Sequence, residues 1–198
     1  MKKSLILACL TLLLTLTAGA ALAEDLTGKL GVTARLGFQI PSDNEVINRS
    51  TISLNNISTD AGFIFGGGFL YGIDKNFAAE FDLTNSNYNG ANSMEFNVVN
   101  ISMGGQYRFK DFSGITPFAG AGLDILLNGA NNGYDVDTTV GLHVNGGIDY
   151  FIMKNLALTG EMKVVVAPTV DIMKSGGKVG NFDPSSFNMT FGVRYFVF

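Results

Sequence analysis

The stretch from Thr139 to Tyr150 reads TVGLHVNGGIDY, and its alternation of side chains decides the fold. One set of alternate positions is mostly apolar: Val140, Leu142, Val144, Ile148 and Tyr150. The other set is small or polar: Thr139, Gly141, His143, Asn145 and Asp149. A period of two is that of an extended strand with one apolar and one polar face. Its length suits a tilted strand crossing a bilayer, which takes about 9–11 residues.

The same alternation returns in eight segments, each of which we predict to be a strand: 29–40, 60–72, 77–85, 94–109, 115–127, 138–150, 156–166 and 187–198. The connections alternate between long polar loops (41–59, 86–93, 128–137 and 167–186) and short turns (73–76, 110–114 and 151–155). Long loops at one rim and tight turns at the other are typical of outer-membrane barrels. We therefore predict an all-β fold, an eight-stranded antiparallel up-and-down transmembrane β-barrel.

The first 23 residues have the pattern of a secretory signal peptide. Lys2 and Lys3 precede an apolar stretch from Leu5 to Leu16, and Ala21-Leu22-Ala23 forms a small-x-small cleavage site. We expect 1–23 to be a signal peptide and 24–198 to be one outer-membrane β-barrel domain. The one cysteine, Cys9, falls inside the predicted signal, so the mature domain has no disulfide framework. Its 11 basic and 17 acidic residues indicate no nucleic-acid partner.

Alternation alone fits either a lipid-facing apolar surface or a soluble, lipocalin-like barrel with an apolar interior. Glycines are frequent on the polar face, as at Gly66, Gly68 and Gly147. They weaken an exposed strand but suit the crowded interior of a small barrel. Aromatic residues near the strand ends, such as Tyr107 and Tyr195, suit a membrane interface. We therefore expect the apolar face to point toward outer-membrane lipid, in a bacterial outer membrane.

Two segments resemble those of known barrels. The last strand, from Phe187 to Phe198, resembles the C-terminal strand of outer-membrane proteins, and 115–122 (ITPFAGAG) is similar to the fifth strand of the OmpA/OmpX-like small outer-membrane β-barrel family. The resemblance covers about Leu26 to Phe198. It implies that the barrel-insertion machinery reads a C-terminal signal made of Phe191, Val193, Tyr195 and Phe198. By parity Phe198 falls on the face opposite to Tyr195, which departs from the family pattern.

The inward parity gathers charged residues, which we interpret as a structural interior charge network: Arg35, Glu80, Asp82, Arg108, Asp124, His143, Asp149, Glu161, Lys163 and Arg194. Charges buried in a barrel must be paired and hydrogen-bonded. We expect Arg108 and Arg194 to lie near the short-turn end with Glu80 and Asp149. The alternative interpretation is a polar pore lined by the same charges.

His143 is the only histidine and thus the natural candidate for catalysis. Lipid A deacylases with eight-stranded barrels pair a His-x-Ser motif with an acid, whereas this chain reads His143-Val144-Asn145 and lacks the serine. We therefore predict no enzymatic activity, no catalytic residue, no cofactor and no metal site. Asp135 and Asp137 lie in a long loop with no further His or Cys ligand.

The favoured function is a non-enzymatic structural or surface-interaction platform with a side-chain-filled interior, whose partners are outer-membrane lipid and a surface ligand of the long loops. The alternative is a narrow, porin-like, OmpW-like channel for small or hydrophobic solutes; a lipid A-modifying enzyme is the third hypothesis. Apolar alternation in 41–59 favours an extension of its hairpin above the membrane. A solvated loop is the alternative interpretation of 41–59 and the expectation for the Gly- and Ser-rich segment 167–186.

Overall fold

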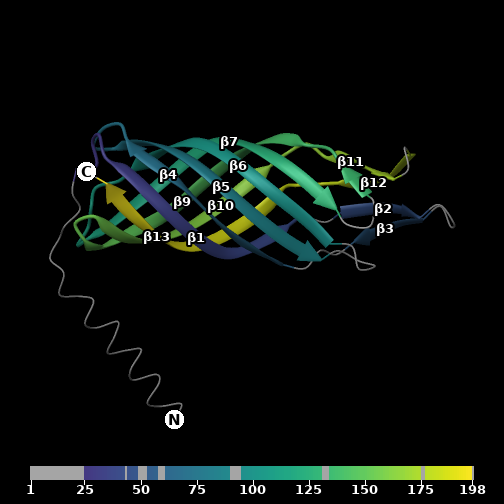
Figure 1. Ribbon diagram of the computed structural model, residues 1–198, viewed down its shortest axis with the longest axis horizontal. Coiled ribbons are helices and arrows are strands. Elements are labelled where there is room, and N and C mark those ends of the chain that lie inside the picture. Colours follow the sequence, from purple (N-terminus) through teal and green to yellow (C-terminus); the bar gives the residue numbers. More distant parts are fainter. Residues whose placement is uncertain are drawn as a thin grey trace, which may run out of the picture.

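The computed structural model describes residues 25–42, 44–48, 53–57, 61–89, 95–130, 134–174 and 177–197. Eight strands close into a barrel: β1 (Leu30–Pro41), β4 (Gly62–Gly72), β5 (Phe77–Asn89), β6 (Glu95–Arg108), β7 (Ile115–Ala130), β9 (Thr139–Met153), β10 (Leu156–Val166) and β13 (Ser186–Val197). Every neighbouring pair is antiparallel. The eight predicted strands are confirmed, and so is the up-and-down order (Figure 1).

Closure depends on the pairing of the first and last barrel strands. β1 pairs with β13 from Leu30↔Val197 to Pro41↔Ser186 and with β4 on its other side. A sheet edge exposed to lipid would leave backbone N–H and C=O groups unpaired at several kcal/mol each. The continuous ladder around the barrel removes that edge.

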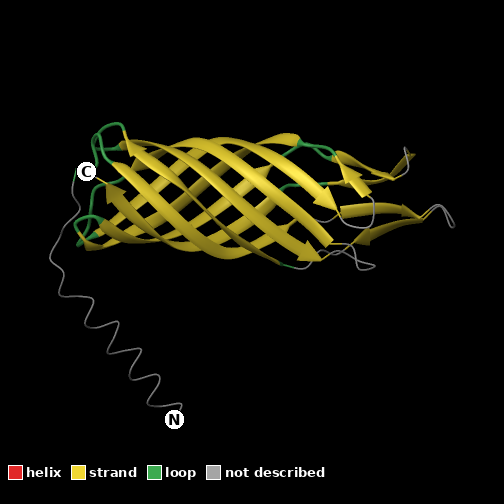
Figure 2. Ribbon diagram, viewed as in Figure 1, coloured by secondary structure: helices red, strands yellow, loops and turns green. Residues whose placement is uncertain are grey.

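A second, five-stranded sheet extends the long-loop end, as Figure 2 shows. Its order is β3 (Ser53–Ile57), β2 (Asn44–Asn48), β12 (Gly177–Phe182), β11 (Val170–Lys174), β8 (Tyr134–Val136). The expected extension of segment 41–59 is present as the β2–β3 hairpin. The expectation of a solvated loop over 167–186 was wrong, because β11 and β12 pair there. Ile172 and Phe182 are buried, and this burial outweighs the loop-like Gly and Ser content.

The short turns close the opposite end. In the β4–β5 turn, the Asp74 carboxylate accepts hydrogen bonds from the backbone N–H groups of Asn76 and Phe77, both at 2.7 Å. This is the local side-chain-to-backbone bonding that makes Asp frequent in turns. The described residues include no helix long and apolar enough to span a membrane. The predicted signal peptide, 1–23, lies outside the described residues.

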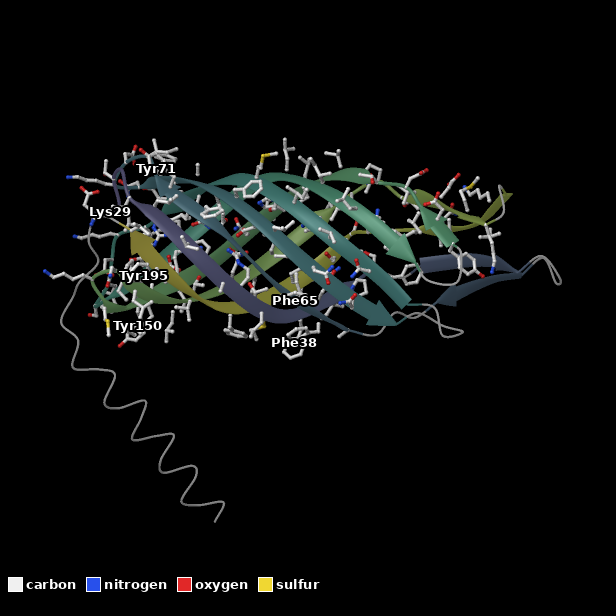
Figure 3. All side chains as sticks on the ribbon, viewed as in Figure 1. Lys29, Phe38, Phe65, Tyr71, Tyr150 and Tyr195 are labelled. Atoms are coloured by element: carbon white, nitrogen blue, oxygen red, sulfur yellow. The ribbon has the colours of Figure 1, made fainter. Side chains whose placement is uncertain are left out.

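The apolar face of the strands points outward. Large apolar residues on the outside include Phe38, Phe69, Leu142, Val144 and Val166, all well exposed. Figure 3 shows Tyr71, Tyr150 and Tyr195 near the short-turn end, with Phe38 and Phe65 farther along the barrel. Tyr107 packs edge-on against two neighbours, and its ring centroid lies 5.2 Å from that of Phe77 and 5.0 Å from that of Phe109. This orientation excludes the lipocalin-like alternative and places tyrosines where a membrane interface favours them.

Replacing Val144 by lysine tests this orientation. Val144 is 59% exposed near the middle of β9, so the change places a charge in hydrocarbon. We expect Val144→Lys to lower the unfolding free energy by about 2–4 kcal/mol, as charges on the lipid face of barrels do near the midplane. The measurement is equilibrium urea unfolding in lipid vesicles. Val144→Leu is the control, and equal stability of the two variants would contradict a lipid-facing position.

Candidate functional site

The barrel interior holds all ten charged residues that the sequence places there, and each is at most 8% exposed. They come from β1 (Arg35), β5 (Glu80, Asp82), β6 (Arg108), β7 (Asp124), β9 (His143, Asp149), β10 (Glu161, Lys163) and β13 (Arg194). Five carboxylates thus share the interior with four permanent cations and one imidazole. Because burial of an unpaired charge is prohibitive, their partners decide whether this interior is stable.

Arg35 is the central cation of this interior charge network. Its Nη1 donates to Glu161 Oε1 at 2.9 Å, and its Nη2 lies 3.1 Å from Glu80 Oε1 and 2.9 Å from Asp82 Oδ1. β1 is adjacent to neither β5 nor β10 in the barrel order. The Arg35 side chain therefore links strands that share no backbone hydrogen bonds, which restrains the barrel across its lumen.

A second group lies toward the short-turn end. Arg108 Nη2 and Arg194 Nη1 each lie 2.7 Å from Asp149 Oδ2. Arg194 Nη2 also contacts Glu80 Oε1 at 3.3 Å, which joins this group to Arg35. We expected four residues to lie together near the short-turn end, and ion pairs connect all of them: Arg108, Arg194, Glu80 and Asp149.

The remaining members lie toward the long-loop end. Lys163 Nζ donates to Ser102 Oγ at 3.1 Å and lies 3.8 and 3.9 Å from Asp82 and Glu161. His143 Nδ1 lies 2.7 Å from Asp124 Oδ2. Asn100 Nδ2 donates to the other Asp124 oxygen, also at 2.7 Å. His143 therefore sits in a hydrogen-bonded carboxylate–imidazole pair that faces the lumen, away from lipid.

Two amides add hydrogen bonds to the carboxylates. Gln106 Nε2 donates to Glu80 Oε2 at 2.7 Å. Asn145 Nδ2 lies 3.2 Å from Glu161 Oε2 and 3.4 Å from Glu80 Oε2. Glu80 thus receives donors from amide and guanidinium groups, as a buried carboxylate requires.

Inward glycines of β4 make room for these side chains. Gly66 and Gly68 lie opposite Arg35 and Thr33 of β1, and Gly68 also lies opposite Asp82 of β5. A Cβ on Gly68 would collide with Asp82 Oδ1 and the Phe81 carbonyl oxygen. The absence of a side chain at this position is therefore what lets Asp82 reach Arg35.

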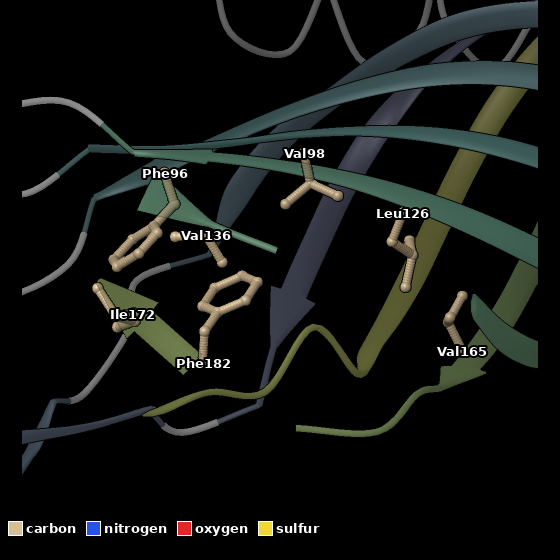
Figure 4. Close-up of a cluster of buried hydrophobic side chains, with 7 residues drawn as sticks. All are labelled: Phe96, Val98, Leu126, Val136, Val165, Ile172 and Phe182. Atoms are coloured by element: carbon tan, nitrogen blue, oxygen red, sulfur yellow. The ribbon is translucent and has the colours of Figure 1, made fainter. Parts of the chain in front are cut away.

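Sequence reasoning missed two apolar clusters that also face inward. The outer cluster, drawn in Figure 4, lies at the long-loop end and joins barrel strands to the second sheet: Phe96, Val98, Leu126, Val136, Val165, Ile172 and Phe182. The inner cluster lies at the short-turn end: Leu26, Leu70, Ala78, Phe151, Ala157 and Phe196. Strand parity could have revealed the outer cluster, because Phe96 and Val98 occupy the same alternate positions of β6 as the inward-facing Asn100 and Arg108. The charged layer therefore lies between two apolar layers.

The C-terminal strand presents three of the four residues assigned to the insertion signal. Phe191, Val193 and Tyr195 are exposed on the lipid side, whereas Phe196 is fully buried and stacks on Phe151 with ring centroids 5.6 Å apart. Phe198 lies outside the described residues. The role of these residues in insertion stays a prediction.

The Asp124–His143 pair is the interior group to compare with a catalytic arrangement. The Asp124–His143 pair is of the kind that orients a general base, but Asn145 stands where a His-x-Ser motif would place its nucleophile. Within the part of the chain that the structure describes, no three His, Cys, Asp or Glu side chains gather in a way that could hold a metal ion.

Arg35→Met tests the energetic importance of the network. It removes the cation shared by Glu80, Asp82 and Glu161 while keeping much of the side-chain volume. We expect a loss of about 3–5 kcal/mol of unfolding free energy, the usual result of leaving buried charges unpaired. Lys178→Met is the matched control, because Lys178 pairs with Asp171 at a half-exposed site and should cost less than about 1 kcal/mol. Equal losses in urea titrations would contradict the network.

Gly68→Ala tests the space that β4 leaves for Asp82. We expect a loss of about 1–3 kcal/mol, as for overpacked interiors. Gly105→Ala is its control, because a Cβ there has only the Ala78 carbonyl oxygen as a neighbour, at 3.9 Å. The same urea titration compares the two variants, and a tolerated Gly68→Ala would show that the interior repacks freely.

Comparison with known proteins places this architecture. The outer-membrane protein OprG from Pseudomonas aeruginosa superposes with a TM-score of 0.70 at 12% identity, over 86% of this chain and 96% of that one. Neisserial surface protein A superposes with a TM-score of 0.63 at 21% identity, over 84% of this chain and 96% of that one. The outer-membrane protein AlkL, whose structure was determined in lipid bilayers, superposes with a TM-score of 0.59 at 15% identity, over 90% of this chain and 94% of that one. These likenesses show the fold.

Comparison with curated protein sequences gave no significant match. The family model of the outer membrane protein beta-barrel domain matches residues 9–195, nearly the whole chain. The closed barrel, its apolar exterior with charges inside, and this match agree. The chain belongs to the outer membrane protein beta-barrel domain family.

Proposed function

We propose that this protein is a closed outer-membrane barrel that serves as a rigid platform for the five-stranded sheet at its long-loop end. The observation that carries the proposal is the packed interior. Arg194, Asp149 and Asp124 are completely buried inside the barrel. An eight-stranded barrel has an interior just wide enough for side chains to fill it. Ions have little room to pass where guanidinium and carboxylate groups are in contact.

The second sheet is the surface that such a platform would present. It combines strands from three separate connections, since β2 and β3 follow β1, β8 follows β7, and β11 and β12 follow β10. Phe182 stacks on Phe96 of β6 with ring centroids 5.1 Å apart. These contacts anchor the sheet to the barrel, so its outer surface is held in one geometry for a ligand.

The proposal has three further parts. Residues 1–23 act as a cleaved signal peptide, and the C-terminal strand engages the barrel-insertion machinery through its outward aromatic residues. The protein has no enzymatic activity. The last point is supported by the position of His143, which faces the lumen beside Asp124 rather than the lipid that an outer-membrane lipid-modifying enzyme must reach.

A narrow channel for small or hydrophobic solutes is the second candidate. Two observations favour it: a cavity of about 440 Å³ at the short-turn end, and the apolar outer cluster at the other end. A hydrophobic solute would then need the charged layer between them to part. This requirement makes the channel the less favoured function.

Planar-bilayer recording separates the two functions. We expect the purified mature barrel to give no steady conductance, because paired side chains fill its lumen. Circular dichroism of the same protein in vesicles checks that it is folded and inserted. Removal of the β2–β3 hairpin is the matched control; it lies outside the barrel and should leave the recording silent. Steady openings of the wild-type protein would contradict the platform and favour the channel.

A further inference from the structure

The outward face of β5 and β6 carries three asparagines, the amide cluster: Asn85, Asn87 and Asn97. Asn85 and Asn87 share the side of β5 that exposes Leu83, and Asn97 of β6 lies directly opposite Asn87. Apart from tyrosines, every other outward position of the barrel strands whose side chain the structure describes is apolar or glycine. Amide groups are costly in hydrocarbon. The amide cluster therefore marks a place where the barrel surface meets a polar partner.

The lengths of the two strands place the amide cluster at the outer boundary of the membrane. At the short-turn end, Phe77 of β5 pairs with Tyr107 of β6 and their rings pack edge-on, as in the aromatic belt at a membrane interface. A tilted strand crosses the hydrocarbon in about 9–11 residues. Asn87 lies ten residues beyond Phe77, and Asn97 lies ten residues before Tyr107. Because long loops of outer-membrane barrels are extracellular, this position corresponds to the headgroup layer of the outer leaflet.

The three amides satisfy one another only in part. Asn97 Nδ2 donates to Asn87 Oδ1 at 2.6 Å and to Asn85 Oδ1 at 3.2 Å. Asn85 Nδ2 donates to Asn97 Oδ1 at 3.3 Å, and Asn87 Nδ2 donates to Asn85 Oδ1 at 3.1 Å. A side-chain amide has two N–H donors and two acceptor lone pairs. The exposed Asn87 therefore keeps one donor and one acceptor without a partner among the described residues.

These free groups and the neighbouring rings suit a sugar. A sugar hydroxyl both donates and accepts a hydrogen bond, so it complements a free donor beside a free acceptor. Phe63 lies opposite Asn87, and Phe65 lies opposite Asn85. Their rings are 49% and 47% exposed and stack with centroids 6.1 Å apart. Because the face of an aromatic ring carries partial negative charge, it favours contact with the C–H groups of a sugar ring.

Charge argues against a phosphate as the group that is recognised. Proteins bind phosphate mainly through Arg and Lys. Neither occupies an outward position of the barrel strands as far as the structure describes them. Lys75, Lys110 and Lys154 lie in the short turns, at the opposite end. We propose that the amide cluster, together with Phe63 and Phe65, binds the sugar headgroup of an outer-leaflet glycolipid of the lipid A type.

Native mass spectrometry of the full mature barrel, released from detergent micelles, tests the class of lipid. The probes are lipid A, lipid A without its phosphates, and cardiolipin, which has four acyl chains and two phosphates but no sugar. We expect both forms of lipid A to bind with affinities within about threefold of each other. Cardiolipin should bind at least about tenfold more weakly, because hydrogen bonds to the sugar are missing. Loss of binding on dephosphorylation, or equal binding of cardiolipin, would overturn the proposal.

Three variants locate the binding. Asn87→Leu removes the free donor and acceptor from an exposed position where leucine suits lipid, and should weaken dephosphorylated lipid A about tenfold. Phe63→Ala removes one ring and should weaken it by a smaller, measurable factor. Phe187→Ala removes an outward ring at the long-loop end of β13, so it is the matched control and should bind normally. Unchanged binding in Asn87→Leu, or an equal loss in Phe187→Ala, would contradict the site.

The same spectra test a second copy of the chain as the occupant of the amide cluster. We expect the wild-type protein and Asn87→Leu to have the same number of chains. A wild-type dimer that Asn87→Leu dissociates, with glycolipid binding unchanged, would overturn the proposal and assign the amide cluster to an interface between copies. None of these outcomes depends on whether the barrel conducts, so the platform function is tested separately.

Discussion

The constraint on which this structure depends is the absence of water from the bilayer core. Backbone groups that cannot bond to solvent must bond to one another, so the sheet must close, and the pairing of β1 with β13 achieves this. Lipid contact then requires an apolar exterior. The ten residues of the interior charge network are consequently placed inside, where Arg35, Arg194 and Lys163 must find partners or make the fold unstable.

The charged interior is stable because cations and carboxylates from distant strands meet in contact. Arg35 joins β1 to β5 and β10, and Arg194 joins β13 to β9 and β5. These ion pairs are specific to one relative stagger of the strands, since a shift by one residue would turn each charge toward lipid. We infer that the interior charge network selects the register as well as filling the lumen. The apolar clusters at both ends shield the charges from water at the rims.

Strand parity made much of this structure predictable. The alternation around His143 located a strand and its inward face, and the same rule placed Arg35, Glu80 and Glu161 inside. Parity does not say which inward residues meet, because a contact such as Arg35 with Glu161 depends on strand tilt and stagger. Parity also places Phe96 and Val98 inside, but the sequence analysis expected a polar lumen and missed these apolar residues. β11 and β12 escaped notice because their pairing depends on Ile172 and Phe182 packing against the barrel end.

The most direct test of the apolar exterior and charged interior is a spin-label scan along β9. The only cysteine of the chain, Cys9, precedes the predicted cleavage site, so single cysteines can be introduced and labelled at residues 140–148 of the mature protein. In lipid bilayers, labels at even positions should be accessible to molecular oxygen, which concentrates in hydrocarbon. Labels at odd positions should be shielded from it. The opposite phase, or accessibility without a period of two, would contradict a barrel with oily side chains outside and charges sealed within.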